Sequence, residues 1–204
     1  WRAQVNDYSL AGLQGRELRN LTVGILGTGK IGAAVIKNLS GFGCRILASD
    51  IRENPSLKGL CTYVDNETLY KACDIISLHM PLLDSTRHFV NAETIARMKD
   101  GVTIINCARG ELMNIPDMIR GIETQKIGAL ALDVFDKEDG IYHENRRDDI
   151  ISNRDMAYLR QFPNVIMTQH MAFYTDAAVQ SMVFCGVGGL CDFAKTGHTA
   201  TELV

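Results

Sequence analysis

The chain of 204 residues is long enough to bury a complete core, and we expect one domain, or one domain and a fragment of another. Its hydrophobic content of 46% and charged content of 22% are ordinary for a soluble globular protein, and its net charge of −3 argues against a nucleic-acid partner. No apolar run reaches the roughly 18 residues of a membrane helix, so we expect no membrane partner either. No signal peptide opens the chain, and its cysteines are scattered without a C-x-x-C pair. These features predict free thiols, no metal site and a cytoplasmic location.

Residues 1–20 predict a short helix and a turn, and the apolar, β-branched run 21–26 predicts the first strand. This run enters the turn Gly27-Thr28-Gly29-Lys30-Ile31-Gly32, which has the G-x-G-x-x-G pattern. Small and apolar residues at helical spacing follow the turn, up to Leu39. A second apolar run then ends on Asp50, at about the distance that the dinucleotide-binding fingerprint requires. This context favours a dinucleotide site over a glycine turn in another kind of α/β protein.

Each part of the fingerprint has a physical role. Gly27 permits the tight turn, Gly29 lets the backbone approach a pyrophosphate, and Gly32 lets the helix and strand pack closely. The free N–H groups and the positive end of the helix then face the phosphates. Asp50 would accept hydrogen bonds from the adenosine ribose and repel a 2′-phosphate, which favours NAD over NADP. Arg52 leaves the other cofactor open, because a nearby arginine can accommodate the phosphate.

Short apolar runs alternate with helical patterns through the rest of the chain. Further strands are predicted at residues 61–64, 75–78, 102–106, 127–134 and 165–167, and helices at 66–73, 91–98, 115–124 and 175–195. This alternation is typical of βαβ units and predicts an α/β fold with a doubly wound parallel sheet of the Rossmann type, covered by helices on both faces. The charged stretch 136–160 has little periodicity, and we interpret it either as a solvated excursion or as a cover over an active site.

Ligands of such sheets bind beyond the carboxyl ends of the strands, so polar residues that directly follow apolar runs are the candidates. These residues are His79, Arg109, Asp133, Glu138 and His170. A nicotinamide-dependent reduction of a 2-oxo acid needs a proton donor, which a histidine supplies near neutral pH. A carboxylate beside the histidine favours the imidazolium, and an arginine fork holds the carboxylate of the substrate. Spacing alone leaves a plainer interpretation open: a satisfied histidine, a surface cation and solvated acids.

Five ordered blocks of the chain resemble the D-isomer-specific 2-hydroxyacid dehydrogenases. The blocks are residues 21–32, 74–81, 106–110, 131–135 and 163–175. The resemblance implies that Arg109 binds the substrate carboxylate, that Glu138 is the partner acid and that His170 is the acid/base. It also implies that the cofactor is NAD. The residues implied to bind it are Gly27, Gly29, Lys30, Ile31, Gly32, Asp50 (adenosine ribose), His79, Met80, Pro81, Cys107, Ala108, Arg109, Asp133 (nicotinamide amide) and His170.

Within this family, residues 170–175 and 140–142 look most like the D-lactate dehydrogenase branch. Two residues depart from the usual pattern: Gln169 stands where proline is usual and Met171 where threonine is usual, which makes the geometry of the histidine loop less certain. The resemblance implies hydride transfer between NAD(H) and a small D-2-hydroxy acid or 2-oxo acid, with D-lactate and pyruvate as the expected pair. The alternatives are another 2-oxo-acid reductase, for example for branched substrates, and an NAD-sensing binding protein like the corepressors of the family.

The family also carries a substrate domain, of which we find almost nothing in this chain. We expect residues 1–20 to be a linker from that domain, residues 21–175 to be the NAD-binding domain, and residues 176–204 to lead back toward the missing part. The chain opens on Trp1 and looks like a piece of a longer protein. We expect it to hold one wall of the active-site cleft and to be poorly active alone. The resemblance also implies a homodimer that pairs through the NAD-binding domain.

Overall fold

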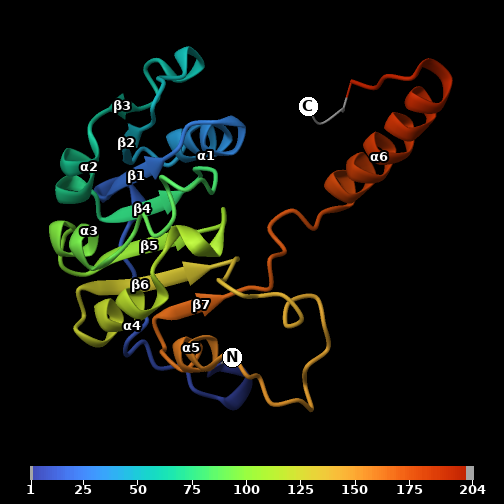
Figure 1. The fold of residues 1–204 in the computed structure, drawn as a ribbon. Coiled ribbons are helices and arrows are strands. Elements are labelled where there is room, and N and C mark those ends of the chain that lie inside the picture. Colours follow the sequence, from blue (N-terminus) through green and yellow to red (C-terminus); the bar gives the residue numbers. More distant parts are fainter. Residues whose placement is uncertain (1, 201–204) are drawn as a thin grey trace.

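The computed structural model describes residues 2–200 and contains one seven-stranded parallel sheet with helices around it (Figure 1). The strands are β1 (Thr22–Leu26), β2 (Arg45–Ser49), β3 (Thr62–Tyr63), β4 (Ile75–Leu78), β5 (Val102–Asn106), β6 (Ile127–Leu132) and β7 (Val165–Met167). Their order across the sheet is β3-β2-β1-β4-β5-β6-β7. The chain therefore winds outward from β1 in one direction and then from β4 in the other, as predicted for a Rossmann-type sheet. The crevice between β1 and β4 is the place where such sheets bind ligands.

The helices in the described residues agree with the predicted ones, with one exception. They are α1 (Lys30–Ser40), α2 (Asn66–Ala72), α3 (Ala92–Arg97), α4 (Ile115–Glu123), α5 (Arg154–Leu159) and α6 (Asp176–Thr196), with short 3-10 helices at Arg2–Val5, Leu18–Asn20, Pro55–Leu57 and Gly110–Leu112. The exception is α5, which lies in the stretch predicted to lack periodicity. Its N-cap Asn153 accepts a hydrogen bond from the backbone N–H of Met156, and it buries Met156 and Leu159. A helix of six residues is too short for periodicity to reveal it.

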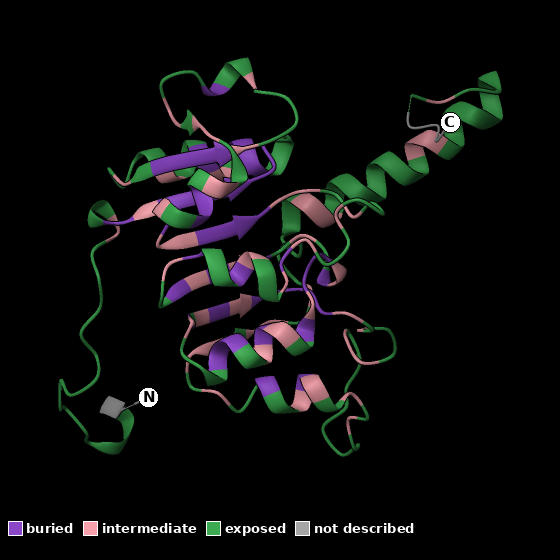
Figure 2. Cartoon of the chain, turned by 60° about the vertical axis from the view of Figure 1, so that its left-hand side comes forward, coloured by how far each residue is buried: buried purple, intermediate pink, exposed green. Residues whose placement is uncertain are grey.

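The sheet is buried on both faces near its centre, because side chains alternate along each strand. On one face, Val23 and Ile25 of β1 pack with Ala33 and Ile36 of α1. On the other, a larger core joins the strands to α2, α3, α4 and α5. Figure 2 shows this arrangement as buried strands between helices that are exposed on their outer sides. The fold thus fixes the strand ends from which the site is built.

The sheet face that α1 covers is less well covered over β5, β6 and β7. The side chains on this face alternate with the core residues of their strands and are only half-buried: Thr103, Ile105, Ala129 and Ala131. Ile166, which is paired with Ala131, is 67% exposed. A regular sheet interior rarely leaves a large apolar residue this accessible. This part of the sheet therefore presents an apolar surface that the described chain does not bury.

Helix α6 extends away from the sheet and contains no buried residue (Figures 1 and 2). Most of its large apolar side chains are more than half exposed, among them Phe184, Leu190 and Phe193. By length and composition it is apolar enough to cross a membrane, so the sequence expectation that no segment reaches this length is wrong. The predicted C-terminal tail continues past this helix, and residues 201–204 lie outside the described residues, as does Trp1.

Candidate cofactor and active site

The glycine turn between β1 and α1 has the backbone geometry that the fingerprint predicts. Gly27 has a φ of 94°, and a Cβ there would lie 2.7 Å from the carbonyl carbon of His79. A Cβ on Gly32 would lie 2.0 Å from the carbonyl oxygen of Gly27, so helix and turn touch at this point. A Cβ on Gly29 would meet no atom within 4 Å. Gly29 is also the N-cap of α1, and it has no side chain that could bond the first N–H groups of the helix. These groups suit a pyrophosphate.

Two cavities are lined by residues of this turn, and together they form a groove. One, of about 340 Å³, is lined by Gly27, Asp50 and residues after β4. The other, of about 550 Å³, is lined by Gly29, Lys30, Ile31, His79, Met80, Pro81, Leu82, Cys107, Ala108 and Arg109. Met80 and Pro81 line both cavities, so the two adjoin. Two adjoining cavities suit an extended dinucleotide. The placement of its adenosine near Asp50 and of its nicotinamide toward Arg109 stays a prediction.

Asp50 follows β2, and the glycine turn holds its carboxylate in place. Its Oδ2 accepts the backbone N–H of Thr28 at 2.5 Å and the Thr28 hydroxyl at 2.9 Å, and its Oδ1 accepts the N–H of Arg52 at 3.2 Å. Burial alone would raise the pKa of Asp50, but these hydrogen bonds outweigh it, and the pKa is lowered. The carboxylate is therefore ionised at neutral pH and can act as an acceptor for ribose hydroxyls.

His79 forms part of the wall next to Gly27 and Gly32. Its Nε2 lies 2.9 Å from the Ser77 hydroxyl, while Nδ1 is buried without a hydrogen-bond partner. Burial lowers the pKa of His79, because the imidazolium would lose its hydration. His79 is thus a neutral part of the groove at pH 7.

The loop that carries Arg109 is fixed by a buried asparagine that the sequence argument did not single out. Asn106, fully buried at the end of β5, donates from Nδ2 to the Arg109 carbonyl at 2.8 Å and accepts the Ala108 N–H at 3.0 Å. The Arg109 side chain is exposed and donates to the Ala108 carbonyl at 2.7 Å. The only sequence signal for Asn106 was an amide at the end of an apolar strand.

His170 and Glu138 form the pair that the resemblance implied. His170 Nδ1 lies 2.5 Å from Glu138 Oε1, and Glu138 Oε2 accepts the Phe135 N–H at 2.8 Å. Both side chains are partly exposed, at 32% and 22%. Because Nδ1 is occupied by the carboxylate, Nε2 is the ring nitrogen that can meet a substrate.

Asp133 anchors the loop of His170. Its backbone carbonyl accepts the His170 N–H at 2.6 Å, and its carboxylate accepts the Thr168 hydroxyl at 2.6 Å and the N–H groups of Met171 and Ala172 at 2.9 and 2.8 Å. Burial raises the pKa of Asp133, but these bonds and the nearby His170 lower it overall. The bonds at Met171 and Ala172 come from backbone N–H groups, which any side chain at position 171 leaves in place. The contact of Asp133 with a nicotinamide amide stays a prediction.

The structure connects the arginine loop to the histidine pair. A Cβ on Gly110 would lie 2.1 Å from the Phe135 carbonyl carbon, so the Arg109 loop presses against the segment that binds Glu138. Residues 136–153 also contribute: the ring of His143 lies 6.2 Å from that of His170, centroid to centroid, and His143 Nε2 is 3.2 Å from the His170 carbonyl oxygen. The charged stretch is therefore part of the wall of the site and not merely a solvated excursion.

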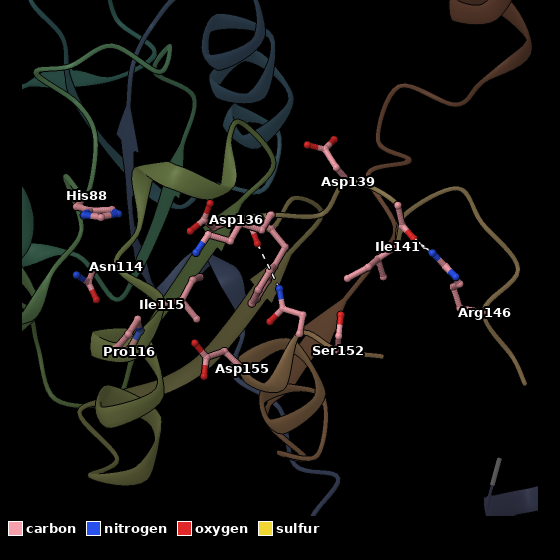
Figure 3. Close-up of a pocket in the computed structure, with 14 residues that line it drawn as sticks. His88, Asn114, Ile115, Pro116, Asp136, Asp139, Ile141, Arg146, Ser152 and Asp155 are labelled. Atoms are coloured by element: carbon pink, nitrogen blue, oxygen red, sulfur yellow. Dashed lines mark hydrogen bonds between the residues drawn. The ribbon is translucent and has the colours of Figure 1, made fainter. Parts of the chain in front are cut away.

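Another cavity, of about 650 Å³, lies next to this site (Figure 3). It is lined by Asp136, Lys137 and Asp139 on either side of Glu138, but not by Arg109, Glu138 or His170. Asn153 Nδ2 donates to the Asp136 carbonyl at 3.5 Å, and Arg146 Nε donates to the Gly140 carbonyl at 2.9 Å. These bonds tie the excursion to itself and to α5. None of the three residues with an implied catalytic role lines this cavity, and we do not place the substrate in it.

Comparison with known proteins agrees with this geometry. Residues 2–172 match the family described as D-isomer specific 2-hydroxyacid dehydrogenase, NAD binding domain. The chain belongs to this family and is its NAD-binding domain, which confirms the predicted fold and cofactor.

Individual relatives are similar over the whole chain. An aromatic 2-oxoacid reductase of Clostridium sporogenes is 44% identical over 204 residues, which cover 100% of this chain and 62% of that protein. A D-lactate dehydrogenase from Sporolactobacillus sp. superimposes with a TM-score of 0.91 at 35% identity, covering 100% of this chain and 62% of that one. The D-lactate dehydrogenase of Aquifex aeolicus, solved with NAD and lactic acid, has a TM-score of 0.88 at 32% identity, with 100% and 64% covered. The chain thus spans less than two thirds of these relatives and resembles the predicted branch.

Proposed function

We propose that the complete protein is an NAD-dependent D-2-hydroxyacid dehydrogenase. The observation that carries this proposal is the His170–Glu138 pair, which stands after β6 and β7 beside the arginine loop that lines the nicotinamide end of the groove. This chemistry requires two groups from the protein: one that exchanges a proton and one that binds a carboxylate. Their presence favours an enzyme over an NAD-sensing binding protein.

The roles of the residues follow from their geometry. Bound NADH supplies the hydride. Arg109 binds the substrate carboxylate through its guanidinium and orients the carbonyl. His170 donates a proton from Nε2 to the carbonyl oxygen, and Glu138 stabilises the imidazolium before transfer and holds the ring through Nδ1. In the reverse direction the same nitrogen takes the hydroxyl proton of the D-2-hydroxy acid. Asp50 binds the adenosine ribose, and Asp133 keeps the histidine loop in place.

The test is an assay of the complete protein with NADH and pyruvate, and with NAD and each enantiomer of lactate. Oxidation of D-lactate without oxidation of L-lactate is the expected result. His170→Ala should lower turnover by about a hundredfold or more, the usual scale of general acid–base catalysis. Near-normal turnover of this variant would show that another group donates the proton, and oxidation of L-lactate alone would contradict the proposal.

The substrate we expect is pyruvate, with an aromatic 2-oxo acid as the second candidate. Phe173 lies with its ring 6.4 Å from that of His170 and 6.0 Å from that of Tyr174, so aromatic side chains adjoin the histidine. The 44% identical relative is named an aromatic 2-oxoacid reductase. Comparison of kcat/KM for pyruvate and phenylpyruvate separates the two candidates.

We infer that residues 2–20 and α6 connect this domain to a substrate domain. Two apolar surfaces support the inference: α6 has no buried residue, and the sheet face around Ile166 is open. A further domain that packs on them would bury both and would close the second wall of the cleft. We also propose that the protein is a cytoplasmic homodimer paired through the NAD-binding domain, which light scattering on the complete protein tests. Sedimentation of the complete protein with membranes would instead point to α6 as a membrane segment.

A further inference from the structure

A chain of hydrogen bonds reaches Asp50 from the edge of the sheet. Tyr63 lies on β3, and its hydroxyl is 3.0 Å from the hydroxyl oxygen of Thr28. The Thr28 hydroxyl is in turn 2.9 Å from Asp50 Oδ2. Thr28 is only 2% exposed, so the central hydroxyl of this series is shielded from water. Tyr63 lines neither of the two cavities of the dinucleotide groove, and its connection to the groove passes through Thr28.

The direction of these bonds is fixed by their first donor. The backbone N–H of Asn54 lies 2.9 Å from the Tyr63 hydroxyl oxygen and can only donate. Tyr63 has one proton, which it gives to the Thr28 oxygen. An ionised carboxylate can only accept, so the Thr28 hydroxyl donates to Asp50. Each bond in such a series polarises the next one, which strengthens the last bond to the carboxylate.

Asn54 also holds Thr28 from its backbone side. Its Nδ2 donates to the Thr28 carbonyl at 3.1 Å. Thr28 is therefore fixed at its hydroxyl by Tyr63 and at its carbonyl by Asn54, while its own N–H is bonded to Asp50. These bonds join the turn after β2 to the glycine turn. The Asp50 carboxylate keeps lone pairs that can accept further hydrogen bonds.

We propose that Tyr63 is a positioning residue for the choice between NAD and NADP. By orienting Thr28 it holds the Asp50 carboxylate where it accepts ribose hydroxyls and repels a 2′-phosphate. Repulsion is effective only while the carboxylate stays in place, because a carboxylate that can turn away admits the phosphate at lower cost. This inference rests on the proposed role of Asp50.

The test is Tyr63→Phe, which keeps the ring and removes the hydroxyl. Binding of NAD and of NADP to the chain is measured by titration calorimetry, and the ratio of the two affinities is the readout. We expect the ratio to fall by about two- to tenfold, the scale of one lost hydrogen bond between neutral groups. Thr28→Val should act in the same direction, because it interrupts the same series. The matched control is Tyr158→Phe, which removes a hydroxyl bonded to Glu123 at 2.9 Å on an exposed surface and should leave the ratio unchanged.

Asp50→Ala separates failure of this inference from failure of the proposed site. If Asp50→Ala lowers the ratio and Tyr63→Phe does not, Asp50 discriminates without Tyr63 and the inference is overturned alone. Equal weakening of both cofactors by Tyr63→Phe would show a purely structural role and also overturn it. If Asp50→Ala leaves the ratio unchanged, the assignment of Asp50 fails, and the inference about Tyr63 fails with it. In the Asp50→Ala background, Tyr63→Phe should have no further effect on the ratio.

Discussion

The Nδ1 atom of His170 lies 2.5 Å from Oε1 of Glu138, although one residue follows β7 and the other follows β6. The carboxylate cannot easily rotate away, because its second oxygen accepts the Phe135 N–H at 2.8 Å. The backbone N–H of His170 is bonded to the Asp133 carbonyl. The imidazole is therefore held at both its ring and its backbone, which is the preorganisation that proton transfer requires.

Replacement of Glu138 by Gln tests the charge of this pair. The amide preserves the size of the side chain but cannot stabilise an imidazolium, so kcat for 2-oxo-acid reduction by the complete protein should fall about ten- to hundredfold. Affinity for NADH should stay the same in calorimetry, because Glu138 lines neither groove cavity. Glu144→Gln, an exposed change in the same excursion, is the control and should have no effect. Unchanged kcat in Glu138→Gln would remove the acid from the mechanism.

Replacement of Asp50 by Ala should weaken NAD binding by about tenfold, the scale of lost hydrogen bonds to a charged group, and should improve the relative affinity for NADP. The pH dependence of NAD affinity also tests the role of the Asp50 carboxylate. Hydrogen bonds from Thr28 and Arg52 hold the pKa of Asp50 below its usual value, so its contribution to NAD affinity is present at neutral pH and is lost only as pH falls through that lowered pKa. In calorimetry from pH 7 down to about pH 4, the NAD affinity should therefore fall less than it would for a carboxyl group with the ordinary Asp pKa.

Asp133→Asn should destabilise the protein by about 1–3 kcal/mol, because an amide cannot accept all three hydrogen bonds that the carboxylate receives from the histidine loop. The pKa of Asp133 is lowered in the folded state, so its stabilisation is present above the unfolded value and is lost as pH falls through the folded one. The difference in free energy of unfolding between Asp133→Asn and the parent should therefore shrink in urea titrations at acid pH. Asp84→Asn, at an exposed position, is the control. An equal loss at pH 7 and at pH 3 would contradict the assigned electrostatics.

Local signals in the sequence predicted most of the helix starts. Asp65 accepts the Thr68 N–H at 2.7 Å, and Asn91 forms a capping box with Thr94, so both act as N-caps where the predicted helices begin. Such signals involve residues a few positions apart. The structure also shows α5, whose formation depends on burial of Met156 and Leu159 against distant parts of the core and not on its own pattern.

The supporting residues of the site were harder to predict for the same reason. Asn106 matters because β5 ends beneath the Arg109 loop, and Tyr63 reaches Thr28 because β3 pairs with β2. Both relationships depend on how the strands are placed next to one another. The exposure of α6 is likewise invisible in its sequence, because an apolar helix pattern looks the same whether or not another surface covers it.

Two glycines allow a matched test of the contact between the Arg109 loop and the Glu138 segment. A Cβ on Gly110 would lie 2.1 Å from the carbonyl carbon of Phe135 and 2.3 Å from the Asp136 nitrogen, so Gly110→Ala must displace backbone on one side. A Cβ on Gly186, inside α6, would meet nothing within 4 Å. Gly186→Ala should stabilise the helix by about 0.5–1 kcal/mol through helix propensity, whereas Gly110→Ala should destabilise by about 1–3 kcal/mol, the cost of overpacking. Thermal unfolding of this chain measures both. In the complete protein, kcat should fall for Gly110→Ala, because the displaced segment contains the Phe135 N–H that is bonded to Glu138. A Gly110→Ala variant with normal stability and normal kcat would mean that the two loops move independently.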